Sequence, residues 1–166
     1  MARTLESYLP PVQEDGIVTS KDTTLSGALT VSGATTFTGA TTGLRHNTES
    51  ISAATKTVTS AMSGRMFVDV LGSGTTTFTL PDAVAGLTYT FVCGNASGEI
   101  LINPQSGDAI VGKTHGAENG TGIAPAAGTG IKNTAATNVV GDFCTLVALD
   151  GTTWYMVAVA GVWASQ

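Results

Sequence analysis

Short runs rich in threonine and in large apolar residues recur from about residue 51, roughly ten residues apart. Turn-forming glycine, proline and aspartate separate them. β-branched and aromatic residues are typical of strands, and short strands at this spacing indicate a β-sandwich or jelly roll. The expected strands are TKTVTSA (55–61), RMFVDVL (65–71), TTTFTLP (75–81), LTYTFVC (87–93), EILIN (99–103), DAIVG (108–112), FCTLVAL (143–149) and WYMVAVA (154–160).

The remaining local signals agree with an all-β fold. No window shows a sustained apolar period of 3.6 residues with caps, so we expect almost no helix. Asp150-Gly151 separates two strong strands and is typical of a hairpin turn. The glycine-rich stretch 113–138 predicts a long loop, on the surface or across a subunit boundary. We therefore expect a jelly-roll-like β-sandwich domain over residues 46–166.

A six-residue repeat precedes this domain: LSGALT, VSGATT and FTGATT follow one another over residues 25–42. Three hexads make one coil of a triangular β-helix, and one coil cannot bury its own apolar face. Copies of the segment from three chains could instead bring their large apolar residues to a common axis. A threonine- and glycine-rich linker with accidental periodicity is the alternative. We expect a hexad-repeat β segment at 25–45 in a trimer, with trimer contacts at Leu25, Val31 and Phe37.

Residues 1–24 have the character of an extended arm. Two adjacent prolines favour extended backbone, and the following Glu-Asp-Gly marks a turn. The stretch is either a frayed terminus or an arm that orders against a partner, and we expect the arm. No apolar stretch follows a basic start and no apolar run approaches the ~20 residues of a membrane span, so we expect neither a signal peptide nor a membrane partner. The expected contact residues of the arm are Tyr8, Leu9, Pro10, Pro11, Val12, Glu14 and Asp15.

Charge is scarce throughout the chain. Charged residues make up 11% of the sequence, against about 25% in an ordinary soluble domain. A surface so poor in charge is weakly protected against association, so we expect much of it to be covered by copies of the chain or by a partner. The net charge is −5 and the basic residues are scattered, so we expect no nucleic-acid binding.

The octapeptide GDAIVGKT (107–114) matches the phosphate-binding loop G-x-x-x-x-G-K-[ST]. That chemistry would place Lys113 on the phosphates and Thr114 on Mg²⁺. It also requires a helix directly after the lysine, because the N-terminal amides of the helix bind the phosphates. The glycine-rich continuation HGAENGTG does not favour a helix. Asp150, which ends the apolar run TLVALD, suits the hairpin turn better than a Mg²⁺ site, so we expect no nucleotide binding.

No residue set indicates catalysis. His46 and His115 stand far apart without Cys, Asp or Glu at metal-ligand spacing, so we expect a surface or interface role for them; an ion bound by three copies around a trimer axis is the alternative. Cys93 and Cys144 fall in expected strands, which favours buried free thiols. The sequence predicts no enzyme, no cofactor, no metal and no small-molecule substrate.

Two long segments resemble a β-rich domain common in tailed-bacteriophage virion proteins. The first, SAMSGRMFVDVLGSGTTTFTLPDAVAGLTYTFVCGNASGEILINPQSGDAIVG, carries Ser-Gly-basic, Thr-Leu-Pro, Gly-Leu-x-Tyr and Ile-x-Pro-x-x-Gly-Asp motifs. The second, GDFCTLVALDGTTWYMVAVAGVW, carries Gly-Asp, Asp-Gly-Thr, Trp-Tyr and Gly-x-Trp. The hexad region is similar to the N-terminal parts of phage fibre and head-decoration proteins. The resemblance covers 25–112 and 141–163.

The resemblance implies a non-enzymatic structural protein, most like a capsid decoration (cement) protein. Such proteins are short, usually trimeric, and clamp the shell where capsid subunits meet. The implied partners are the major capsid protein and further copies of the chain, and the implied location is the capsid surface of the virion, after synthesis in the host cytoplasm. A tail fibre or receptor-binding spike is the alternative; the three hexads would make at best a short shaft, which favours decoration.

A carbohydrate-binding β-sandwich module is a further alternative from a different class. Such a module needs an exposed aromatic platform, for which Tyr155 and Trp163 are the candidates. Their apolar neighbours favour burial instead.

Overall fold

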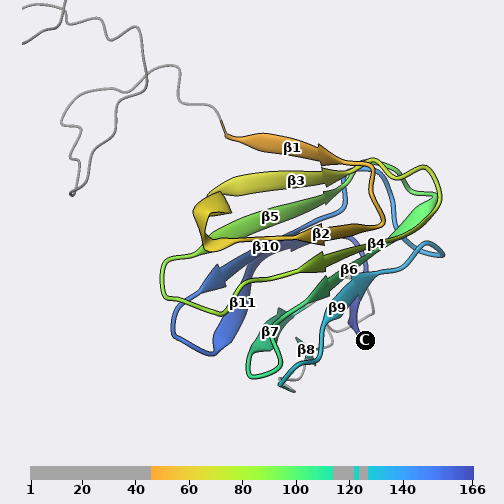
Figure 1. The fold of residues 1–166 in the computed structure, drawn as a ribbon. Coiled ribbons are helices and arrows are strands. Elements are labelled where there is room, and N and C mark those ends of the chain that lie inside the picture. Colours follow the sequence, from red (N-terminus) through yellow and green to blue (C-terminus); the bar gives the residue numbers. More distant parts are fainter. Residues whose placement is uncertain (1–45, 114–121, 124–126) are drawn as a thin grey trace, which may run out of the picture. The chain divides into compact units, whose positions relative to one another are not determined.

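The computed structural model describes residues 46–113, 122–123 and 127–166 (Figure 1). The chain divides into two units, Met1–Thr42 and Gly43–Gln166, and all described residues belong to the second. The expected arm and hexad segment lie outside the described residues. Their boundaries, and the trimer built on them, stay predictions.

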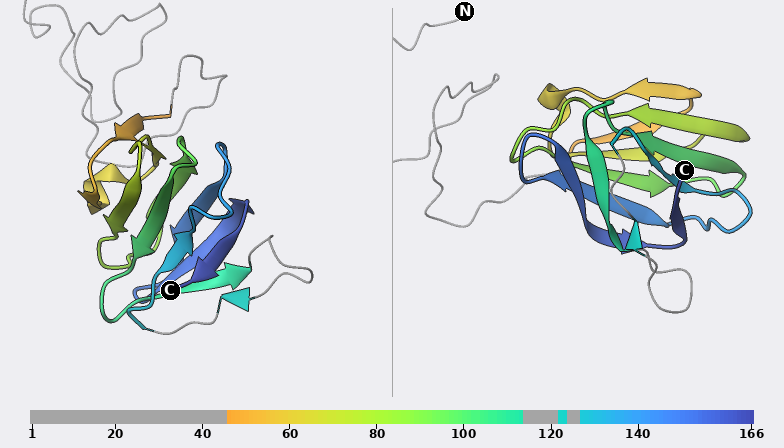
Figure 2. Two further views of the ribbon diagram at one scale, coloured as in Figure 1. Left: turned by 90° about the vertical axis from the view of Figure 1, so that its right-hand side faces the viewer. Right: turned by 90° about the horizontal axis from the view of Figure 1, so that it is seen from below.

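The second unit consists of two β-sheets that face each other as two layers (Figure 2). The only helix among the described residues is a 3-10 helix at Ser60–Met62, and none there is long and apolar enough to cross a membrane. The large sheet has the order β1 (Thr48–Ile51), β3 (Arg65–Asp69), β5 (Thr88–Cys93), β10 (Phe143–Ala148), β11 (Thr153–Ala160), β7 (Ala109–Lys113) and β8 (Gly122–Ile123). The small sheet has the order β12 (Trp163–Ser165), β9 (Ile131–Asn133), β6 (Gly98–Asn103), β4 (Gly74–Thr79) and β2 (Thr55–Thr57).

From β1 to β6 the chain alternates between the two sheets. Each strand pairs in parallel with the next strand that the chain adds to the same sheet. As a result, β1, β3 and β5 are adjacent in the large sheet, and β2, β4 and β6 are adjacent in the small sheet. Thr48 lies opposite Met66 and Gly74 opposite Gly98, so neighbouring strands are 18 and 24 residues apart in sequence. This part of the chain is a flattened spiral. Strands β9 to β12 then add antiparallel pairs to both sheets, and β11 also pairs in parallel with β7, which is followed by β8 at the end of the large sheet.

The predicted all-β sandwich is confirmed, but the predicted jelly-roll connectivity is wrong. A jelly roll is built from antiparallel strands, whereas both sheets here contain parallel pairs. The alternation of buried and outward residues is the same in both kinds of pairing, because it follows from the period of two in any strand. The sequence pattern therefore identified strands without identifying their partners.

The eight predicted strands all occur, with ends shifted by a few residues and with 55–61 shortened to β2. The predicted turn at Asp150 is confirmed, since β10 and β11 pair in antiparallel fashion and Asp150 Oδ1 accepts a hydrogen bond from the Thr152 N–H at 2.8 Å. Four short strands were not predicted. Two of these, β8 and β9, lie within the stretch 113–138 that was expected to be a loop; the others are β1 and β12.

The core lies between the two layers. Phe91 packs at its centre, with its ring centroid 5.6 Å from that of Phe67 and 4.9 Å from that of Phe78. Tyr89 continues this aromatic group toward Trp154, at 5.6 Å. Fully burying one such side chain stabilises the fold by about 1.5–3 kcal/mol. The largest fully buried side chains are Trp154, Trp163, Tyr89, Phe67, Phe78, Phe91, Leu80, Ile100, Ile102, Ile110, Ile131 and Leu146.

Candidate functional site

The Ser-Gly pair that precedes β3 fixes the start of β5. Gly64 has a φ of +82°, a conformation that side-chain-bearing residues rarely adopt, and its N–H donates to the Thr88 carbonyl at 2.8 Å. Ser63 Oγ accepts a hydrogen bond from the Thr88 N–H at 3.1 Å. The motif thus ties two neighbouring strands together.

The Ile-x-Pro-x-x-Gly-Asp motif fixes the turn before β7. Asp108 is buried, and its Oδ2 accepts a hydrogen bond from the Ala83 N–H at 2.8 Å. Gln105 Nε2 in the same turn donates to the Leu80 carbonyl at 2.6 Å. Lys113 then ends a strand rather than opening a helix, and it pairs with Gly122 of β8. Lys113 thus belongs to a strand, although the stretch from residue 113 was expected to be a loop; Thr114 lies outside the described residues.

The Gly-Asp and Gly-x-Trp motifs meet at one end of the sandwich. Asp142 is buried, and its Oδ2 accepts hydrogen bonds from Asn133 Nδ2 and from the Val139 N–H, both at 3.0 Å. Gly161 lies against this carboxylate, where an added Cβ would be 2.1 Å from Asp142 Cγ. Trp163, two residues further on, is buried and its Nε1–H donates to the Ala160 carbonyl at 3.0 Å.

The motif residues behind the sequence resemblance therefore occupy turns and the core. Their polar groups bond to the backbone or to each other within the fold. The resemblance accordingly describes a scaffold. It does not describe a set of reactive groups directed at a substrate.

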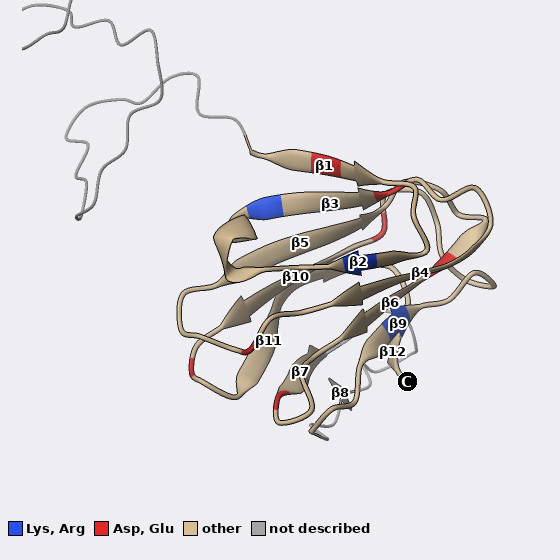
Figure 3. Ribbon diagram, in the orientation of Figure 1, with Lys and Arg blue, Asp and Glu red and all other residues tan. Residues whose placement is uncertain are grey.

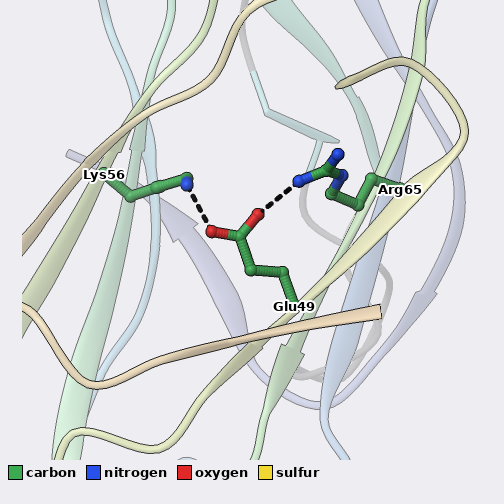
Figure 4. A network of polar contacts seen from close by, with 3 residues as sticks. All are labelled: Glu49, Lys56 and Arg65. Atoms are coloured by element: carbon green, nitrogen blue, oxygen red, sulfur yellow. Dashed lines mark hydrogen bonds and ion pairs between the residues drawn. The ribbon is translucent and has the colours of Figure 1, made fainter. Parts of the chain in front are cut away.

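Three charged residues form an ion-pair network where the spiral begins (Figure 4). Glu49 of β1 accepts hydrogen bonds from Lys56 of β2 through Oε1 and from Arg65 of β3 through Oε2, the latter at 2.7 Å. Lys56 Nζ lies 5.9 Å from the centroid of the Phe67 ring. The hydrogen bonds from Lys56 and then Arg65 lower the pKa of the Glu49 carboxyl.

The network covers the edge of the core. Glu49 is in register with Phe67, and Lys56 with Phe78, both of which are buried. Within the part of the chain that the structure describes, β1 and β2 are the outermost strands at this edge of their sheets. Inward-pointing charges on outer strands are a common means of discouraging pairing with foreign strands. The network is therefore best explained as protection of an open edge.

A hollow of about 340 Å³ lies beside this edge. This volume is near the lower limit for small-molecule sites, and the Arg65 guanidinium at its wall is already bonded to Glu49. His46 stands at the rim and is exposed, while His115 lies outside the described residues. The described portion contains no group of three His, Cys, Asp or Glu residues placed to bind a metal ion. The lining residues are His46, Asn47, Ala61, Met62, Ser63, Gly64 and Arg65.

The two cysteines are buried free thiols, as predicted. Burial raises the pKa of both thiols, most strongly that of Cys144. The negative charges of Asp142 and Asp69 raise the pKa of Cys93 further. Since the thiolate is the reactive form, both side chains act as small core residues.

The predicted contact residues lie outside the described part of the structure, so they stay predictions: Tyr8, Leu9, Pro10, Pro11, Val12, Glu14 and Asp15 of the arm, and Leu25, Val31 and Phe37 of the hexads. The structure does test the aromatic platform. Trp163 is only 2% exposed, and Tyr155 is half-buried with its hydroxyl 3.4 Å from Asp150 Oδ2. The two rings therefore do not form an exposed sugar-binding surface.

No protein-family model matches the chain, and no curated protein matches it.

Proposed function

We propose that the chain is a non-enzymatic structural protein of a bacteriophage virion. In this proposal it binds the outer capsid surface as a homotrimer and stabilises the shell. Its partners are the major capsid protein and two further copies of itself.

The observation that carries the proposal is the structural role of the shared motifs. The resemblance to virion proteins rests on residues such as Gly64, Asp108, Asp142 and Gly161, and each of these determines a turn or a junction between strands. A likeness concentrated at such positions supports a common scaffold. Scattered likeness at solvent-facing positions would not support one.

Decoration would act by mass action. A protein that binds only the assembled, expanded shell stabilises that state, by about 2.7 kcal/mol per site at a free concentration a hundredfold above Kd. Glu14 and Asp15 of the arm would pair with basic residues of the shell. Exposed pairs of this kind contribute only about 0–1 kcal/mol each, so apolar contacts of the arm would supply most of the affinity.

Co-sedimentation tests the proposal. Recombinant protein should pellet with expanded, undecorated capsids of the phage that encodes it, in a saturable ratio to the capsid protein. It should not pellet with unexpanded shells, because the binding sites form on expansion. Binding to host cells with inhibition of phage adsorption would instead favour the fibre or spike alternative.

A further inference from the structure

The outer face of the large sheet is unusual in composition. Along β3, β5 and β10, buried residues alternate with residues on the side away from the core, and the register with β10 shows which residues of β11 lie on that side. The strand register arranges these outward residues in three rows. The rows are Met66–Thr90–Thr145–Ala158, Val68–Val92–Phe143–Ala160 and Thr88–Val147–Tyr155; we call these residues the neutral face.

None of these residues is Asp, Glu, Lys or Arg, and strands β5, β10 and β11 contain no charged residue at any position (Figure 3). Apart from three threonines and the Tyr155 hydroxyl, its side chains are apolar. The hydroxyls of Thr90 and Thr145 form a hydrogen bond with each other at 3.0 Å, so these two groups depend less on hydrogen bonds to water. Within the face the register of β10 and β11 shifts between Thr145 and Leu146, so Val157 has no partner on β10, and its side chain is 56% exposed.

The outer face of the small sheet has the opposite character. Its outward residues include Thr55, Thr77 and Thr79, and charges at Glu99 and Lys132. Sheets with one solvated face normally show this polar pattern. The two faces belong to the same sandwich, so their difference reflects what covers each of them.

Charge indicates which partner fits the neutral face. The chain carries a net charge of −5, and the exposed acidic residues Asp82 and Asp150 lie in turns rather than within the neutral face, although Asp150 borders it through its hydrogen bond with the Tyr155 hydroxyl. Copies of the chain repel one another wherever these groups meet, and the neutral face is where they can approach without such repulsion. A polyanion finds no cation there, and a basic partner would lose hydration without gaining a counter-charge.

We propose that the neutral face is a surface through which copies of this chain associate. Apolar side chains of one copy lie on those of another, with the threonine pair at the centre. The inference deepens the proposed homotrimer by naming a surface, but it does not depend on capsid binding. Its test therefore uses the isolated full-length chain.

Sedimentation velocity on three charge variants tests the proposal. Thr90→Glu on β5 and Thr145→Glu on β10 place a carboxylate at the centre of the neutral face in every copy. Thr77→Glu on β4 is the matched control, because Thr77 is also half-buried and outward-facing, on the small sheet. Wild type and Thr77→Glu should sediment as the same oligomer, and the two neutral-face variants as monomers with unchanged far-ultraviolet circular dichroism.

Hydroxyl-radical labelling of the wild type provides a readout that needs no variant. Met66 and Phe143 should be labelled several-fold less in the oligomer than after dilution, whereas Leu101 on the small sheet should not change. Equal labelling of Met66 and Phe143 in both states would overturn the proposal.

Three other outcomes also contradict it. One is a wild type that stays monomeric at its highest soluble concentration. The second is that the Thr90→Glu and Thr145→Glu variants fold and still sediment with the oligomer mass of the wild type. The third is dissociation only when Leu25, Val31 and Phe37 are replaced by Asp, which would assign association to the hexads alone. The proposed function has a separate test. If the variants dissociate as expected but the wild type does not pellet with capsids, the proposed function is rejected while association through the neutral face stands.

Discussion

Gly141 and Gly161 both have positive φ, at +99° and +87°, but their surroundings differ. An added Cβ at Gly141 would meet nothing within 4 Å, whereas at Gly161 it would collide with the buried carboxylate of Asp142. A side chain at Gly141 would therefore cause backbone strain alone, whereas a side chain at Gly161 would cause both backbone strain and a steric clash.

We predict that Gly141→Ala lowers the free energy of unfolding by about 1–2 kcal/mol, the usual cost of a left-handed conformation for a residue with a Cβ. Gly161→Ala should cost more, because Asp142 must also move and lose its hydrogen bonds to Asn133 and Val139. Urea unfolding of both variants measures the difference. If both variants lose the same free energy of unfolding, the contact between the added methyl group and Asp142 is relieved without cost and the prediction is wrong.

Asp108 gives a second prediction. Asp108→Ala leaves the Ala83 N–H without its buried acceptor and should lower the free energy of unfolding by about 1–3 kcal/mol. Asp108→Asn should cost less, since the amide oxygen can still accept that bond. Thermal and urea unfolding compare the two variants. A larger loss in Asp108→Asn than in Asp108→Ala would contradict the assigned hydrogen bond.

At the scale of the element, the Glu49 network links β1, β2 and β3. The pKa of Glu49 is lowered in the folded protein, while in the unfolded chain it stays near its ordinary value of about 4.3. The stabilisation from the ionised carboxylate is therefore complete well above that value. It is lost as the pH falls through the lower folded pKa.

We predict that Glu49→Gln is less stable than wild type at neutral pH and that the difference shrinks as the pH falls below about 4.3. The glutamine does not ionise, so it removes this part of the pH dependence. Urea midpoints measured from neutral to acid pH give the comparison. A stability difference that does not change with pH would show that the ion pairs are not its cause.

The strands that sequence could predict are those with a strong period-two pattern, such as β5 with Tyr89, Phe91 and Cys93 inside. Strand β1 escaped prediction because Ile51 is its only buried residue. Strands β9 and β12 have three residues each, too few to establish a period. The sequence pattern also carried no sign of parallel pairing. The inward charge of Lys56 was, however, a usable sign that β2 is an outer strand.

The candidate surfaces were less predictable than the strands. Rejection of the phosphate loop needed only the glycines after Lys113, and burial of the thiols needed only their place in strands. The neutral face could not be read from sequence, because Met66, Thr90 and Thr145 become neighbours only through the strand register. The arm and hexad contacts stay predictions.

At the scale of the whole molecule, the small number of charged residues and their placement on the two sheets both indicate a surface that favours association. The sequence indicated a surface weakly protected against association, with 11% charged residues. The strand registers place charged residues on the outer face of the small sheet and none among the residues of the neutral face. Association through the neutral face, as proposed above, would cover the uncharged surface and leave the charged one in solvent.

The disruption temperature of expanded capsids, measured by differential scanning calorimetry at increasing concentrations of the protein, tests the central claim most directly. We predict that the temperature rises on addition and continues to rise slowly above saturation, because a ligand that binds only the intact shell stabilises it in proportion to the logarithm of its free concentration. Thr77→Glu should reproduce the wild-type curve. A disruption temperature that stays constant at every concentration would contradict the proposed stabilisation of the shell.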